Sequence, residues 1–175
     1  MSQKPFSSYI TPPSRLTNFQ KVLEFNKAFN VKTFFEPQLD IFDKDPKLVQ
    51  LKLDLILEEV QEFKDAIKDK NMTEILDSVG DILYVVYGAA TAFGFNADQV
   101  FNIIHQSNMS KLCDTEEDAI ITVQKYKEEV PQRYDSPAYR RSDNGIHWVV
   151  YNKSSGKILK SYKYSEVDFT ELLKN

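Results

Sequence analysis

The sequence predicts an all-α protein, an antiparallel helical bundle that carries a small C-terminal β-hairpin. Apolar residues recur at helical spacing over most of the first 130 positions, and a helix start signal precedes each such stretch. Beyond residue 131 the pattern changes to two short runs of aromatic and β-branched residues around a turn. We therefore expect an N-terminal arm over residues 1–13, a helical bundle over 14–130 and an extension with the hairpin over 131–175.

The first helix is predicted over residues 17–30. Thr17 and Gln20 have the spacing of a capping box, and apolar residues follow at helical intervals. A loop over residues 31–45 comes next. Asp45 followed by Pro46 combines an N-cap residue with a proline at the first helical position, which predicts a second helix over residues 46–68.

The third helix is expected to begin at Asn71 and Glu74 and to end at Gly94. It is apolar almost all round its circumference, so we expect it to be central in the bundle. A fourth helix is predicted from Asn96 to about residue 112 and a fifth from Thr115 to about 129. Residues 147–151 and 157–162 are predicted to pair as strands across a turn at 152–156.

Composition excludes several classes of protein. Twenty-six acidic and 22 basic residues give a net charge of −4, so no overall positive field favours nucleic acid. Cys113 has no partner for an internal disulfide, and residues 1–25 do not resemble a secretory leader. We expect no membrane-spanning helix, because no apolar run approaches the roughly 20 residues that such a helix needs. We expect an intracellular, cytoplasmic protein that binds neither nucleic acid nor membrane.

Acidic residues lie on the expected apolar stripe of the second helix. On a helical wheel Glu59 and Glu62 fall within roughly 40° of a line of leucines and alanine, and Glu58 lies about 60° to its side. In the third helix Asp77 and Asp81 share one line with Gly88. Carboxylates gathered between two helices repel one another unless they are protonated or bind cations.

The chemistry of these side chains indicates a hard divalent cation. Ligand sets made of oxygen alone favour Mg²⁺, with Mn²⁺ as a second possibility, and Mg²⁺ takes substrate phosphates as further ligands. In the fourth helix Asn108 and Lys111 share the face of Val100, Phe101 and Ile104, and a lysine on such a face needs an anion. We therefore expect Asn108 and Lys111 to bind phosphate.

Simpler interpretations are also open. Each acid taken alone fits a solvated helix face, and His105 fits an ordinary hydrogen-bonded histidine. Asn26 and Phe29, with the aromatic residues near them, are weak candidates for a base pocket. A di-iron carboxylate bundle is excluded, because it needs Glu-x-x-His on two helices and neither His105 nor His147 follows a glutamate by three residues.

Three motifs in order resemble the all-α nucleoside triphosphate pyrophosphohydrolases, the superfamily of MazG proteins, dimeric dUTPases and phosphoribosyl-ATP pyrophosphohydrolases. The similarity covers roughly residues 17–113. The motifs are Glu-Glu-Val-Gln-Glu at 58–62, Asp-Ser-Val-Gly-Asp-Ile-Leu-Tyr-Val-Val-Tyr-Gly at 77–88 and His-Gln-Ser-Asn-Met-Ser-Lys-Leu at 105–112. The Asn-x-x-Lys helix is most similar to the phosphoribosyl-ATP pyrophosphohydrolase-like branch.

The resemblance implies Mg²⁺-dependent hydrolysis between the α and β phosphates of a nucleoside triphosphate, which releases a nucleoside monophosphate and pyrophosphate. It implies that Glu59, Glu62 and Asp81 are metal ligands and that Glu58 orients or deprotonates the attacking water. Many members have an acid where this chain has Ser78, so Asp77 is the neighbouring candidate for the fourth ligand. Asn108 and Lys111 would hold phosphates.

Several alternatives remain open from the sequence. A nucleotide-pool housecleaning enzyme is favoured over a phosphoribosyl-ATP pyrophosphohydrolase, and a non-catalytic nucleotide-binding or regulatory bundle is the third possibility. Related bundles form homodimers or homotetramers, so we expect a homo-oligomer. No motif identifies the nucleotide base.

Overall fold

The structure is a computed structural model, described here over residues 16–174, and it divides into two compact units. The first contains the described residues up to Val100 together with those from Phe169 onward, and the second contains Phe101–Asp168. The division therefore falls inside a helix, whereas the sequence placed the boundary at residue 130. The predicted arm at residues 1–13 lies outside the described residues.

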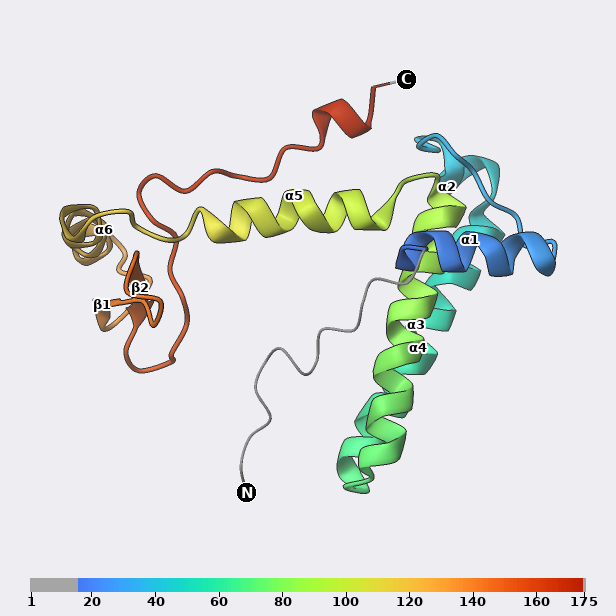
Figure 1. Cartoon of the computed structure of the whole chain (residues 1–175), viewed down its shortest axis with the longest axis horizontal. Coiled ribbons are helices and arrows are strands. Elements are labelled where there is room, and N and C mark those ends of the chain that lie inside the picture. The colour runs from blue at the N-terminus through green and yellow to red at the C-terminus, as the bar shows by residue number, and fades with distance from the viewer. Residues whose placement is uncertain (1–15, 175) are drawn as a thin grey trace. The chain divides into compact units, whose positions relative to one another are not determined.

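The first unit is built on two long antiparallel helices (Figure 1). They are α3 (Pro46–Lys68) and α4 (Met72–Phe93), and the short connection between them keeps them adjacent. α1 (Asn18–Ala28) packs across α4, and the one-turn helix α2 (Ile41–Lys44), which lies in the expected loop, contacts α3.

The helix start signals of the sequence are confirmed. The Thr17 side chain and Gln20 form both halves of a capping box at α1, and Asp45 accepts a hydrogen bond from the Leu48 amide at α3. Asn71 caps α4 through the amides of Thr73 and Glu74. Each cap satisfies amides that the first turn of a helix leaves unpaired.

Gly94 ends α4 in the left-handed conformation, with φ of 84°. A Cβ at this position would lie only 1.9 Å from the carbonyl oxygen of Glu36. Gly94 is thus required both for its backbone angle and for the close approach of the loop before α2.

The second unit combines helices with the small sheet. α5 (Ala97–Met109) runs into it from the first unit, and α6 (Glu116–Glu128) packs on the two-stranded sheet of β1 (Pro137–Arg141) and β2 (Trp148–Asn152). A core closes around the buried side chains Cys113, Ala119, Val123, Tyr126, Val150 and Leu159. The fold class, helical with a small C-terminal hairpin, is confirmed.

The predicted hairpin is confirmed only in part. Residues 157–159 pair antiparallel with β2 through a bridge between Tyr151 and Ile158 and two backbone hydrogen bonds, each 2.9 Å long, but they form no full strand. The ladder of β2 is formed instead with β1, in register from Pro137 opposite Asn152 to Arg141 opposite Trp148. The sequence analysis missed β1 because its last two residues are exposed arginines, as expected of an edge strand, and it lacks the apolar alternation used to recognise strands.

α4 is long and apolar enough, by length and composition alone, to cross a membrane. The sequence-based statement that no segment approaches this length is therefore wrong. α4 packs against α3 and α1, and it carries the ionisable residues Glu74, Asp77 and Asp81. Only 33% of its apolar stretch is buried among the described residues, so part of the apolar surface of α4 is exposed in the single chain.

Candidate active site

Five acidic side chains surround one point on the α3–α4 pair. Glu59 is half-buried on α3, and the pKa of its carboxyl is raised by burial and then by the negative charges of four neighbours. These neighbours, in order of decreasing effect, are Glu62, Asp81, Glu58 and Asp77. The structure therefore brings together all five acids of the first two motifs, with Glu59 at the centre.

The acids are less enclosed than the wheel suggested. Glu58, Glu62, Asp77 and Asp81 are exposed, and across the described residues no three His, Cys, Asp or Glu side chains converge closely enough to hold a metal ion. Leu51, expected beside Glu62 on the buried stripe, is 50% exposed. Like charges repel, so the carboxylates turn outward while their helices hold them near one another.

The chemistry of this set fits a hard divalent cation. All five side chains offer only carboxylate oxygens, and the cluster carries several negative charges with no basic residue among the neighbours that shift the Glu59 pKa. Glu59 and Glu62 on α3, with Asp77 and Asp81 on α4, are the residues that would hold such a cation.

Ser78 does not belong to this cluster. Its side chain is 3% exposed, and its hydroxyl donates a 2.7 Å hydrogen bond to the carbonyl oxygen of Glu74 one turn earlier. The hydroxyl is thus engaged within α4, while the neighbouring Asp77 contributes to the field at Glu59.

Asn108 and Lys111 lie together in the second unit, at and just beyond the end of α5. The Lys111 ammonium donates a 2.6 Å hydrogen bond to the Asn108 side-chain oxygen. Asn108 is exposed and Lys111 half-buried, and Phe101 on the same helix is 67% exposed. The face that they share is therefore open within the unit rather than packed in a core.

The two weak candidates for a base pocket occupy different surroundings. Asn26 is 4% exposed and donates a 2.9 Å hydrogen bond from its side-chain amide to the Thr91 hydroxyl, which fixes α1 on α4. Phe29 is 67% exposed and stacks on Phe25 with ring centroids 4.3 Å apart. His105 is also exposed.

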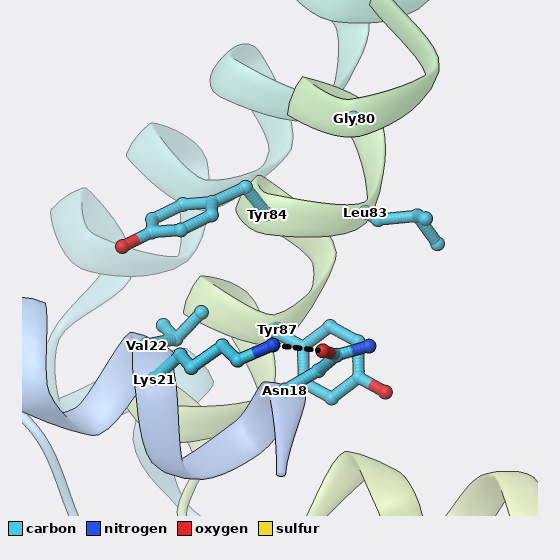
Figure 2. Close-up of a pocket in the computed structure, with 7 residues that line it drawn as sticks. All are labelled: Asn18, Lys21, Val22, Gly80, Leu83, Tyr84 and Tyr87. Carbon is cyan, nitrogen blue, oxygen red and sulfur yellow. Dashed lines mark hydrogen bonds between the residues drawn. The ribbon is translucent and has the colours of Figure 1, made fainter. Parts of the chain in front are cut away.

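A pocket lies between α1 and α4, and two of its lining residues, Gly80 and Tyr84, are near Asp81 in sequence. Figure 2 shows the tyrosine rings of Tyr84 and Tyr87 on α4 and the side chains of α1 that complete the pocket. The Lys21 ammonium on its rim donates a 3.2 Å hydrogen bond to the Asn18 side-chain oxygen. The pocket combines aromatic walls with one cation.

The sequence analysis missed Lys52. This residue of α3 is 8% exposed, and its ammonium lies 3.9 Å from the position that a Cβ on Gly88 would occupy. The signal was present in the sequence, because Lys52 lies seven residues before Glu59, and a spacing of two turns places the two residues within about 20° of each other on the wheel.

Comparison with known proteins shows the family to which the chain is similar. The sequence model of the phosphoribosyl-ATP pyrophosphohydrolase family matches residues 17–108, which include the helices of the acidic cluster. An uncharacterized protein of Acanthamoeba polyphaga mimivirus, L479, is 30% identical over 246 aligned positions. That alignment covers 93% of this chain and 98% of the viral protein.

Proposed function

The chain belongs to the phosphoribosyl-ATP pyrophosphohydrolase family, a group of enzymes that hydrolyse pyrophosphate bonds in nucleotides, and on this premise we propose a more specific activity. The protein hydrolyses a nucleoside triphosphate between the α and β phosphates, with Mg²⁺ or Mn²⁺, to a nucleoside monophosphate and pyrophosphate. The observation that carries the proposal is the gathering of five carboxylates around Glu59 on α3 and α4.

The side chains have separate tasks in this reaction. Glu59, Glu62, Asp77 and Asp81 would hold the cation, which when bound polarises phosphoryl oxygens and neutralises charge in the transition state. Glu58, beside this set, accepts a proton from water as the water oxygen attacks phosphorus. The bond from phosphorus to the bridging oxygen breaks, and the pyrophosphate leaves with its electron pair.

The identity of the substrate is the next question. Phosphoribosyl-ATP fits the family as well as a canonical or damaged nucleoside triphosphate does, and we favour a housecleaning role inside the cell, in the cytoplasm. A screen of pyrophosphate release over canonical nucleotides, modified nucleotides and phosphoribosyl-ATP, each with Mg²⁺ and with Mn²⁺, tests the activity. Tight nucleotide binding without pyrophosphate release would instead identify a regulatory nucleotide-binding protein.

We expect Lys111→Met to weaken the use of a triphosphate substrate while the protein stays folded. Methionine keeps most of the aliphatic stem and removes the charge that would pair with phosphate, and such charge-assisted hydrogen bonds contribute about 1.5–3 kcal/mol. We therefore expect kcat/KM to fall roughly 10- to 100-fold. Lys127→Met, at an exposed position of α6, is the matched control, and an unchanged kcat/KM in Lys111→Met would contradict the phosphate role.

We also propose that a second copy of the chain covers the outer face of α4, giving a homodimer or, by a further pairing, a homotetramer. Exposed apolar side chains recur along this helix at the alternating spacing of three and four that packs one helix on another: Leu76, Val79, Leu83 and Val86. On the wheel they lie opposite Gly88, which faces α3. Nucleotide enzymes of this class act on water-soluble substrates, so we favour a protein partner over a lipid one.

Leu76→Glu is expected to shift the assembly to monomers. Leu76 is 70% exposed in the single chain, so glutamate is tolerated there in the monomer but leaves a desolvated charge in the interface. Sedimentation velocity measures the result, with Ile120→Glu on α6 as the control for adding a charge at an exposed apolar site. A monomeric wild type, or an oligomer that Leu76→Glu leaves intact, would exclude this interface.

A further inference from the structure

Lys52 is a buried cation that forms no ion pair with any residue of 16–174. It is 8% exposed, and desolvation lowers the pKa of its ammonium, with no acidic neighbour acting in the other direction. Lysine is seldom buried unless its charge is paired, because removing an ammonium from water costs more than its stem gains by burial. A gain in stability therefore does not explain why a lysine is buried at this position.

The polar groups beside Lys52 are already engaged with one another. The Thr91 hydroxyl donates a 2.8 Å hydrogen bond to the carbonyl oxygen of Gly88 and accepts the 2.9 Å bond from the Asn26 amide. This chain joins α1 to α4 and does not include the lysine. The ammonium thus keeps its three donors for another group.

Lys52 and the acidic cluster lie on one seam between α3 and α4. Seven residues separate Lys52 from Glu59, which places them on the same face of α3 about 10 Å apart along its axis. Seven residues also separate Gly88 from Asp81 on the antiparallel partner helix. Along the contact between the two helices, Lys52 and Gly88 are therefore about two helical turns from Glu59 and Asp81.

Gly88 is the part of α4 that faces the Lys52 ammonium. A Cβ on Gly88 would lie 3.9 Å from the ammonium nitrogen, an ordinary van der Waals distance. Gly88 is itself buried, so the ammonium lies at the contact between α3 and α4.

We propose that Lys52 binds a phosphate oxygen of the polyphosphate chain whose other oxygens would be held by a divalent cation at the acidic cluster. The inference rests on the proposed function for the nature of the anion. An extended polyphosphate and the four-carbon stem of lysine together bridge the separation between Lys52 and the acidic cluster. The charge that is uncompensated in the free protein is paired when the substrate arrives, and Lys52 acts as a substrate-binding residue.

Binding of inorganic tripolyphosphate with Mg²⁺, measured by calorimetry on the full chain, tests this assignment. Lys52→Met is expected to bind about 10- to 100-fold more weakly than wild type, the effect of losing one charge-assisted hydrogen bond. Lys64→Met removes the same charge from an exposed position of the same helix and should bind like wild type. Lys52→Arg should restore part of the affinity.

Thermal unfolding without ligand separates binding from folding. Lys52→Met should hold or raise Tm, because it removes a desolvated charge and keeps the apolar stem. If Lys52→Met fails to fold, Lys52→Gln serves instead: it keeps a polar end group and removes the charge, and should also weaken tripolyphosphate binding.

Pyrophosphate release from nucleotides, measured in parallel, distinguishes the two proposals. An active wild type whose Lys52→Met variant keeps full tripolyphosphate affinity and KM would overturn the role of Lys52 alone. Lysine-dependent tripolyphosphate binding in a protein that hydrolyses no nucleotide would support Lys52 and overturn the proposed reaction. A wild type that neither binds tripolyphosphate nor releases pyrophosphate overturns both.

Discussion

Glu59→Gln is expected to abolish pyrophosphate release while leaving the protein folded. Glu59 is the acid on which the charges of the other four converge, so its loss removes the central ligand of the proposed cation. Changes to groups that merely support metal ligands cost about 10- to 100-fold, and we expect the loss here to exceed 100-fold. The measurement is the initial rate of pyrophosphate release across a Mg²⁺ titration, with Asp54→Asn, on another face of α3, as the control.

The same variant has an expected signature in stability. The pKa of Glu59 is raised above the ordinary 4.5, so the folded protein holds this proton more tightly than the unfolded chain. Ionisation of wild-type Glu59 therefore reduces stability as pH rises from about 4.5 through the raised value, and glutamine removes that loss. Without divalent cations, Glu59→Gln should unfold at an equal or higher temperature than wild type at neutral pH, and the difference should shrink toward pH 4. Wild-type activity in Glu59→Gln would contradict the metal assignment.

The helical part of the fold could be predicted from local chemistry. Thr17, Asp45, Asn71 and Thr115 are all observed as N-caps, and Gly94 ends α4 as expected. These signals act within one turn of a helix, so a single sequence contains them in full. The strand β1 could not be found in this way, because its place is set by pairing with β2 and not by its own apolar pattern.

The sequence predicted the chemistry of the site more fully than the packing around it. Helical spacing alone places the acids of α3 and α4 on facing lines, and the structure has them near one another. The helical wheel predicted which residues share a face of each helix, but it could not predict which neighbouring helix packs on that face. Lys52, about 60° to one side of that line on α3, is buried, and Leu51, on the other side, is exposed, because the contact with α4 is centred closer to Lys52 than the apolar residues indicated.

The resemblance to the pyrophosphohydrolases implies an acid at the position of Ser78, and the structure makes the departure testable. Ser78 is buried with its hydroxyl bonded to the Glu74 carbonyl oxygen, whereas Asp77 is exposed and contributes to the negative field at Glu59. Asp77 and Asp81 are one turn apart, so both carboxylates reach the same side of α4. We therefore propose Asp77 as the residue of α4 that completes the ligand set with Asp81.

Asp77→Asn is expected to raise the Mg²⁺ concentration needed for half-maximal activity by at least about 10-fold, since a neutral amide is a poorer ligand than a carboxylate for a hard cation. Ser78→Ala should leave the Mg²⁺ dependence unchanged, because the hydroxyl is already engaged within the helix and alanine is the better helix former. Metal titrations of activity in both variants, with unfolding curves to show that each is folded, decide the matter. If Asp77→Asn left the Mg²⁺ dependence of activity unchanged while Ser78→Ala lowered activity strongly, the ligand on α4 would be assigned one residue out of register.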